Sequence, residues 1–258
     1  MLLTIDIGNT NITLGIFDEK KLIESFRLVS DKTLSQEKYK ALLKTIYEKF
    51  DIKECVIGSV VEELSFTLKS ACDKLFGLDS LLITPEKDCG MEILLKNPKE
   101  VGADRIANAY GAKNKYTLPA IVVDIGTATT FDIISKNGDF LGGVIMPGLN
   151  LQFKSLSTNT SKLPQIEINT SSKAIGDSTE NAMLSGIIRG SACAIEGLIH
   201  QCEAELGEKA TIIATGGHSK LISEYMIRKF DFVNSNLTLE GLKLLYELNK
   251  KPSLHLNN

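Results

Sequence analysis

Two carboxylates in this chain each stand at the end of an apolar run and directly before a glycine turn. Asp6 belongs to the run D-I-G-N-T-N at 6–11, and Asp124 belongs to D-I-G-T-A-T-T at 124–130. A glycine lets the backbone turn sharply and come close to a ligand, and the hydroxyls and amides that follow are neutral hydrogen-bond donors. A carboxylate beside such a turn can hold a hydrated Mg²⁺ ion. The pattern predicts two phosphate-binding hairpins, about half a chain apart, that hold one nucleotide from both sides.

The first turn taken alone also fits a plain hairpin, because Asn, Thr and Gly are ordinary turn residues. Its neutral donors are Asn9, Thr10, Asn11 and Thr13. A second Asp-Ile-Gly turn at an equivalent place, with hydroxyls in place of amides, is hard to attribute to chance. We therefore expect a duplicated nucleotide-binding framework.

A third acidic residue lies between the two turns, in the run V-G-A-D-R-I at 101–106. The apolar residues that follow predict a helix beginning near Gly102, so Asp104 and Arg105 fall in its first turn. A carboxylate there can take a proton from an alcohol that attacks a phosphate, and an adjacent arginine can hold an anionic substrate. The alternative is that Asp104 only complements the helix dipole and that Arg105 forms a surface ion pair.

A fourth segment is A-T-G-G at 214–217, where an apolar strand runs into two glycines at a helix start. Bare backbone there could receive an adenosine group, although an ordinary strand-to-helix turn has the same signature. Several other nucleotide and hydrolase signatures are missing from the sequence, namely G-x-x-x-x-G-K-[ST], G-x-G-x-x-G, H-R-D, D-F-G and G-x-S-x-G. Their absence excludes a P-loop protein and weakens the case for a serine hydrolase.

The elements that must position these residues follow from the hydrophobic pattern. Short apolar runs between turn residues predict strands, and apolar residues at helical spacing predict helices. In the first half the expected strands are 2–5, 12–17, 22–28, 55–59 and 81–83, and the expected helices are 34–50 and 61–76. In the second half the expected strands are 120–123, 130–135, 140–145 and 211–214, and the expected helices lie near 177–205, 217–228 and 237–249. Two meanders, each followed by alternating helices and strands, predict an α/β architecture.

The repeated order predicts two domains, 1–115 and 116–258, and the chain is long enough for both. The boundary can instead fall inside the helix that starts near residue 101. The segment 155–173 is rich in Ser, Thr and Asn, which predicts a mobile loop or lid.

The amino-acid composition limits the classes of partner that the protein is expected to bind. The net charge of −3, the absence of Trp and an aromatic content of 6% argue against nucleic acid as a partner. No run approaches the roughly 18 apolar residues of a membrane span, and Asp6 interrupts the first apolar run, which argues against a signal peptide. The five cysteines form no C-x-x-C pair and the three histidines lack metal-ligand spacing, so we expect reduced thiols and a cytoplasmic protein.

The motifs together resemble those of the type III pantothenate kinases. The order is D-I-G-N-T-N at 6–11, G-A-D-R at 102–105, D-I-G-T-A-T-T at 124–130, G-G-x-I-x-P-G at 142–148, I-G-D-S-T at 175–179 and A-T-G-G at 214–217. That family belongs to the superfamily of acetate and sugar kinases, Hsp70 and actin. The resemblance therefore implies duplicated ribonuclease H-like, actin-like ATPase domains with mixed sheets flanked by helices. It also implies ATP-dependent phosphorylation of pantothenate to 4′-phosphopantothenate, the first step of coenzyme A biosynthesis.

The resemblance assigns roles to individual residues. The segment implied to hold the ATP phosphates, with Mg²⁺ near Asp6, consists of Asp6, Ile7, Gly8, Asn9, Thr10, Asn11, Ile12 and Thr13. Asp104 is implied as the general base, and the residues implied to bind pantothenate are Gly102, Ala103, Asp104, Arg105 and Thr179. Asp124 is implied to coordinate a monovalent cation, K⁺ or NH₄⁺, and Thr127 to contact ATP. The family resemblance further implies a homodimer.

Two positions depart from the family pattern. Many members carry a Tyr that contacts pantothenate where this chain has Leu95, and an Asn where this chain has Ser178. Two alternative functions fit part of the pattern. Another small-molecule kinase or phosphatase of the superfamily would keep both Asp-Ile-Gly turns, and a non-catalytic regulator on this scaffold would be expected to lose Asp104 or Asp124, both of which are present.

Overall fold

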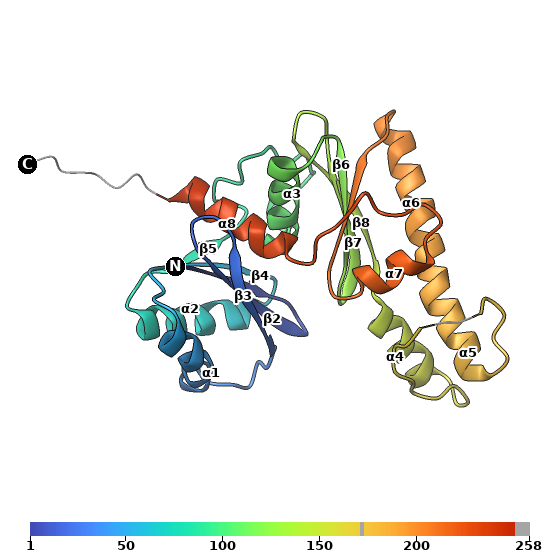
Figure 1. Ribbon diagram of the computed structural model, residues 1–258, viewed down its shortest axis with the longest axis horizontal. Helices are drawn as coiled ribbons and strands as arrows, with labels where there is room; N and C mark the ends of the chain where they lie inside the picture. The colour runs from blue at the N-terminus through green and yellow to red at the C-terminus, as the bar shows by residue number, and fades with distance from the viewer. Residues whose placement is uncertain (171–172, 251–258) are drawn as a thin grey trace, which may run out of the picture. The chain divides into compact units, whose positions relative to one another are not determined.

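The computed structural model describes residues 1–170 and 173–250 (Figure 1). The chain divides into two compact units. Unit 1 comprises 1–92, 96–111 and 237–258, and unit 2 comprises 93–95 and 112–236. The predicted domains, 1–115 and 116–258, differ from these units because the last helix, α8 (Leu237–Asn249), packs on the first sheet. The boundary falls inside α3 (Ala103–Lys115), which is the alternative position that the sequence left open.

Unit 1 is built on a five-stranded mixed sheet of order β3-β2-β1-β4-β5. Its strands are β1 (Leu2–Ile7), β2 (Asn11–Phe17), β3 (Leu22–Val29), β4 (Glu54–Ser59) and β5 (Leu81–Ile83). The first three form an antiparallel meander, and β4 and β5 add in parallel to β1. The helices α1 (Gln36–Lys49) and α2 (Glu62–Phe76) cover one face, where alternate strand residues are buried, and α8 contacts the other (Figure 1).

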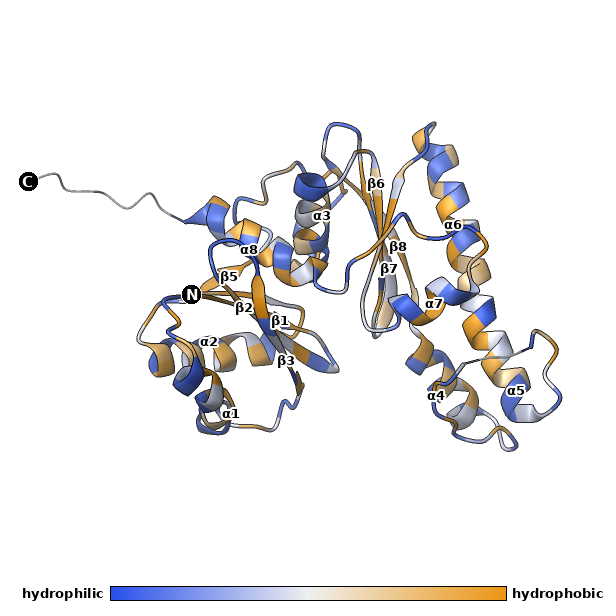
Figure 2. Ribbon diagram, in the orientation of Figure 1, coloured by the Kyte–Doolittle hydropathy of each residue, from blue (hydrophilic) through white to orange (hydrophobic). Residues whose placement is uncertain are grey.

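Unit 2 repeats this sheet, with the order β10-β9-β6-β7-β8. Its strands are β6 (Ala120–Ile125), β7 (Ala128–Ile134), β8 (Phe140–Pro147), β9 (Thr211–Thr215) and β10 (Phe232–Val233). The helices are α4 (Leu149–Asn159), α5 (Thr179–Leu184), α6 (Gly190–Leu206) and α7 (Ser219–Tyr225). Apolar side chains of α4 to α7 form one core with the inner face of this sheet. The strands are accordingly hydrophobic along most of their length (Figure 2).

The duplication extends to single residues. β1 and β6 have the same burial pattern, with five buried residues and one half-buried residue, and β2 and β7 also match each other. The half-buried residue is Asp6 in β1 and Asp124 in β6. A strand that is otherwise buried on both faces exposes a carboxylate at the same place in both units. The predicted α/β fold with duplicated, helix-flanked mixed sheets is confirmed.

Three details of the predicted elements need correction. The segment 155–173 was expected to be a loop, but α4 continues to Asn159, so irregular structure begins at Thr160. Residues 171–172 of that segment lie outside the described residues. The helix expected near 177–205 begins at Thr179, because Ser178 is the N-cap and its Oγ accepts from Asn181 N–H at 3.1 Å. That helix passes through a π-helical segment, Ser185–Arg189, before α6.

One helical stretch among the described residues, Thr179–Leu206, is long and apolar enough in length and composition to cross a bilayer. Half of its most apolar window is buried, and its buried side chains belong to the unit 2 core. Packing within the unit therefore accounts for its composition. All five cysteines are free thiols in the structure, as the sequence led us to expect.

Candidate functional site

The first Asp-Ile-Gly turn joins β1 to β2 in unit 1, with the half-buried Asp6 just before it. Asn9 and Thr10 at the tip of the turn are exposed. The side chains of Ile7 and Ile12, which belong to the predicted nucleotide-binding set, are fully buried in the unit 1 core. These two residues can therefore offer only backbone groups to a ligand, whereas the exposed tip can offer side chains as well.

The predicted base, Asp104, lies at the same edge of the unit 1 sheet as this turn. Val60 follows β4 directly, and its N–H donates to Ile7 O at 3.1 Å, at the end of β1. A Cβ on Gly102 would lie 3.0 Å from Val60 Cγ1 and 2.5 Å from Asp104 Oδ1. The start of α3 therefore packs at the carboxyl ends of β1 and β4, where ligands usually bind in open α/β sheets. Gly102 is needed there because a side chain would displace the Asp104 carboxylate.

The electrostatics of Asp104 suit a proton acceptor. Burial raises the pKa of its carboxyl above the ordinary value for Asp. The backbone N–H of Arg105, which donates to Asp104 Oδ1 at 2.7 Å, and the Arg105 charge lower the pKa and oppose this effect. A carboxylate with a raised pKa is a stronger base than an ordinary Asp carboxylate and accepts a proton more readily. Ala103, also in the predicted substrate set, has a buried side chain and could contact a ligand only through its backbone.

The second Asp-Ile-Gly turn joins β6 to β7 in unit 2, and its tip residue Thr127 is exposed. Asp124 pairs with Thr130 on β7 and with Thr215 on β9. The segment 214–217 thus reaches the turn through the parallel pairing of β9 with β6. The A-T-G-G motif and the second turn, which the sequence singled out separately, form one cluster.

Glycines make this cluster possible. Gly216 has a positive φ of 86°, and a Cβ on it would lie 2.4 Å from Asp124 Oδ1. A Cβ on Gly148 would lie 2.3 Å from Gly126 O. The backbone N–H of His218 donates to Ile125 O at 3.1 Å, and His218 is half-buried. Bare backbone therefore surrounds Asp124. Gly148, which ends the G-G-x-I-x-P-G motif, belongs to this cluster, although no site role was predicted for it.

The predicted substrate residue Thr179 belongs to unit 2, unlike residues 102–105, which belong to unit 1. It is the first residue of α5 and is exposed. The preceding segment is held against the helix, because Ser185 Oγ donates to Ala174 O at 2.6 Å and a Cβ on Gly176 would lie 2.3 Å from Ala182 N. Both contacts fix the place where α5 begins.

Leu95, which stands where many family members have Tyr, also belongs to unit 2. It packs beside β8, since a Cβ on Gly142 would lie 3.0 Å from Leu95 Cδ2. The backbone N–H of Leu94 donates to Phe140 O at 2.8 Å and holds this segment along the strand. Leu95 is half-buried, so its side chain can form part of an apolar wall.

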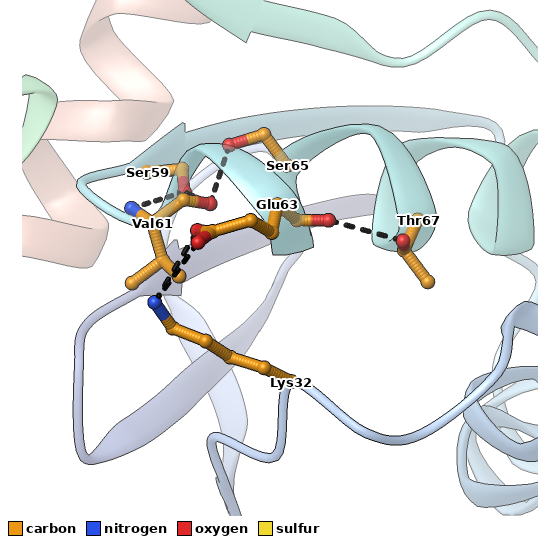
Figure 3. A network of polar contacts seen from close by, with 6 residues as sticks. All are labelled: Lys32, Ser59, Val61, Glu63, Ser65 and Thr67. Atoms are coloured by element: carbon orange, nitrogen blue, oxygen red, sulfur yellow. Dashed lines mark hydrogen bonds and ion pairs between the residues drawn. The ribbon is translucent and has the colours of Figure 1, made fainter.

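An open pocket of about 360 Å³ adjoins the start of α3 in unit 1. It is lined by Ser59, Val60, Glu62, Ser65, Phe66, Leu82, Ile83 and Thr84. Figure 3 shows the hydroxyls of two of these residues, Ser59 and Ser65, turned to the backbone of Val61, to whose carbonyl Ser65 Oγ donates at 2.9 Å. Val60 both lines this pocket and flanks Gly102, two residues before Asp104.

No three His, Cys, Asp or Glu side chains gather as a metal site within residues 1–170 and 173–250. A cation at Asp6 or Asp124 would therefore have one carboxylate from that turn and would complete its shell with carbonyls, hydroxyls, phosphates or water. Such an all-oxygen set with few carboxylates suits Mg²⁺, which keeps several of its waters. The oxygen ligands around Asp124 equally suit a monovalent cation.

Solved structures with the same fold include some that are bound to AMPPNP. A Baf-family protein from Campylobacter jejuni matches with a TM-score of 0.63 at 24% identity, covering 96% of this chain and 98% of that one. A ROK-family glucokinase from Streptomyces griseus, in complex with glucose and AMPPNP, matches with a TM-score of 0.56 at 15% identity, covering 94% and 98%. MreB5 of Spiroplasma citri, bound to AMPPNP, matches with a TM-score of 0.55 at 14% identity, covering 96% of each chain.

Comparison with known sequences identifies the family, which the likeness in fold alone does not. The family model for type III pantothenate kinase matches residues 2–201. A type III pantothenate kinase from Exiguobacterium sibiricum is 41% identical over 255 residues, which is 97% of this chain and 100% of the relative. One from Bacillus cytotoxicus is 39% identical over 254 residues, which is 96% of this chain and 97% of the relative. With both Asp-Ile-Gly turns, the Gly102–Arg105 run and this full-length similarity in place, the chain belongs to the type III pantothenate kinase family.

Proposed function

We propose that this protein transfers the γ-phosphoryl group of ATP to the hydroxyl of pantothenate, giving ADP and 4′-phosphopantothenate for coenzyme A biosynthesis. The observation that carries the proposal is the placement of Asp104. It is half-buried with a raised pKa at the same sheet edge as the first Asp-Ile-Gly turn. The relatives named type III pantothenate kinases supply the identity of the acceptor.

We assign the ATP phosphates and their Mg²⁺ ion to the turn of unit 1. The exposed Asn9 and Thr10 supply neutral donors there, and Asp6 supplies the carboxylate. Phosphoryl transfer needs positioning and charge neutralisation more than covalent help, so donors held around the phosphates suffice without a P-loop lysine. Bound Mg²⁺ supplies the neutralisation of phosphate charge.

Asp104 is the general base in this proposal. Its carboxylate accepts the proton of the pantothenate hydroxyl as the hydroxyl oxygen forms a bond to the γ-phosphorus. The bond between the γ-phosphorus and the β–γ bridging oxygen breaks, and its electron pair leaves with ADP. Arg105 holds the anionic substrate, and Gly102 and Ala103 contact it through the backbone. The pocket that Val60 lines in unit 1 is the space that we assign to the acceptor.

The second turn has a different task in this proposal. Asp124 binds the monovalent cation, K⁺ or NH₄⁺, which offsets phosphate charge, and the exposed Thr127 contacts ATP. Thr179 contacts pantothenate from the start of α5, and Leu95 contributes an apolar wall without the hydroxyl of a Tyr. We further propose a cytoplasmic homodimer that engages neither nucleic acid nor membrane, in keeping with the net charge of −3.

The proposal is tested by incubating purified protein with ATP, Mg²⁺ and pantothenate in K⁺ buffer. ADP release and the mass of the product are followed, and a parallel reaction contains Na⁺. We expect pantothenate-dependent ADP release that is matched by 4′-phosphopantothenate and stimulated by K⁺. ADP release that pantothenate does not stimulate in K⁺ would contradict the assigned acceptor.

A further inference from the structure

The two Asp-Ile-Gly turns differ by one residue, a difference that the matching letters of the sequence conceal. In unit 2 the Gly126 N–H donates to Ala128 O, and Ile125 pairs with Thr129 across the hairpin. In unit 1 the equivalent bond runs from Gly8 N–H to Asn11 O, and Ile7 pairs with Ile12. Counting back from the paired residues, Thr10 corresponds to Thr127, and Asn9 is the additional residue.

Each turn is braced by the residue that directly follows the third strand of its sheet. Asn11 pairs with Val29 and Ala128 with Pro147, so Ser30 and Gly148 occupy equivalent positions. The backbone N–H of Ser30 donates to Thr10 O at 3.0 Å, and that of Gly148 donates to Thr127 O at 3.2 Å. One backbone contact is therefore common to both units.

The side chain makes the difference. Ser30 Oγ donates to Gly8 O at 2.5 Å, which gives the first turn a second brace. In unit 2 the corresponding carbonyl is that of Gly126, and it lies so close that a Cβ on Gly148 would be 2.3 Å away. The shorter turn has no room for a side chain at this corner. The first turn, which is longer by Asn9, has space at this corner, and the Ser30 side chain fills it.

The segment that carries Ser30 is itself held in place. The hydroxyl of Tyr39, a fully buried residue of α1, donates to Asp31 O at 2.9 Å and lies 3.2 Å from Asp31 N. Lys32 Nζ bonds the carboxylate of Glu63 at the start of α2, at 3.2 and 3.3 Å (Figure 3). A serine whose two following residues are anchored to α1 and α2 can hold the turn rather than follow its movements.

We propose that Ser30 is a positioning residue for the nucleotide phosphates, an inference that rests on the function proposed above. The peptide bond is planar and trans, so the Gly8 carbonyl and the Asn9 N–H point in opposite directions. Holding Gly8 O toward Ser30 directs the Asn9 N–H away from Ser30, on the side of the turn that a phosphate would approach. The Ser30 hydroxyl thus preorganises a backbone donor without touching the nucleotide.

The test compares Ser30→Ala and Ser30→Thr with a matched control, Thr4→Val. Thr4 Oγ1 donates to Gly15 O at 3.3 Å in the same hairpin, away from its turn. The dissociation constant for MgATP is measured by titration calorimetry, and the KM values for ATP and pantothenate are measured by ADP release. Loss of one hydrogen bond of ordinary strength predicts about a fivefold to tenfold rise in the Kd and KM for ATP in Ser30→Ala. The KM for pantothenate stays within about twofold.

Ser30→Thr keeps the hydroxyl and returns the Kd for MgATP to within about twofold of the wild type, whereas Thr4→Val lowers stability and leaves this Kd unchanged. An unchanged Kd in Ser30→Ala, an equal rise in Thr4→Val, or no rescue by Ser30→Thr would each overturn the positioning role. If the wild type binds MgATP but does not phosphorylate pantothenate, the proposed acceptor is wrong. The calorimetric constants still decide the role of Ser30 in that case.

Discussion

The turn at Asp6 and the turn at Asp124 stand on equivalent strands, yet their surroundings have opposite chemical character. The first is longer by Asn9 and is braced by a serine side chain, and its exposed tip offers donors. The second is pressed against Gly148 and Gly216, so backbone carbonyls and one carboxylate lie close together. A donor-rich turn suits an anion and an oxygen-rich cluster suits a cation, which is why we assign the phosphates to one and the monovalent cation to the other.

The largest expected effect concerns the base beside the first turn. Asp104→Asn keeps the shape of the side chain but cannot accept the proton, so we predict that kcat falls by about 10² or more. Binding of MgATP, measured by calorimetry, stays within about threefold. In the wild type the acid limb of the kcat/KM profile lies above the pKa of an ordinary Asp, because burial raises the pKa of Asp104. An Asp104→Asn enzyme with near-wild-type turnover would remove this residue from the base role.

The next effect tests the crowding at the second turn. Gly148→Ala places a Cβ against Gly126 O, and we predict a loss of about 1–3 kcal/mol in the free energy of unfolding. Turnover falls about tenfold because the backbone around Asp124 must shift. The control is Gly197→Ala in α6, where a Cβ meets nothing within 4 Å and should leave both quantities equal or improved. If the two variants had the same stability in thermal unfolding and the same turnover, the second turn would have room for a side chain at position 148, contrary to this prediction.

The smallest effect on catalysis comes from a framework contact in unit 2. The carboxylate of Glu203 is only 4% exposed and accepts from the two terminal guanidinium nitrogens of Arg228 at 2.7 and 2.8 Å. It also accepts from the N–H of Ala210, just before β9. Arg228 is the main cause that lowers the pKa of Glu203 to about 2. A lowered pKa means that this stabilisation is present above the unfolded-state pKa of about 4.3 and is lost as the pH falls toward 2.

We therefore predict that Glu203→Gln costs roughly 2–3 kcal/mol in the free energy of unfolding at neutral pH and flattens the loss of stability between about pH 5 and 2. The turnover of the folded enzyme is nearly unchanged, because Glu203 supports the strand that leads to Gly216 rather than the turn itself. Thermal unfolding across this pH range measures the effect. If the variant lost stability between about pH 5 and 2 as steeply as the wild type, another carboxylate would be the main cause of that loss.

Much of the fold followed from the sequence because hydrophobic periodicity and turn residues are local signals. The meanders, the repeated order of strands and helices and the two glycine turns needed no tertiary information. The assignment of α8 to the first sheet did need it, because an amphipathic helix pattern does not say which sheet its apolar face will cover. The same limit applies to residues 155–159, whose polar composition conceals the last part of α4, where Leu156 packs against the core.

The residues of the candidate site also fall into those that local sequence motifs reveal and those that only the tertiary structure reveals. Asp6, Asp104 and Asp124 could be proposed because carboxylates near glycines are visible as motifs. Ser30 could not, since its role depends on the pairing of β2 with β3, which brings a residue distant in sequence to the turn. The additional Asn9 was hidden for a related reason. The letters D-I-G match in both copies, and only the hairpin register reveals that the turns differ in length.

The division of labour between the turns is tested most directly by the cation dependence of Asp6→Asn and Asp124→Asn. Initial rates of pantothenate phosphorylation are measured while Mg²⁺ and K⁺ are titrated separately. We predict that Asp6→Asn raises the half-saturating Mg²⁺ concentration about tenfold and leaves the K⁺ response unchanged. Asp124→Asn should weaken or abolish the K⁺ response and leave the Mg²⁺ requirement nearly unaltered. Variants that shift the same cation, or that exchange these effects, would contradict the account.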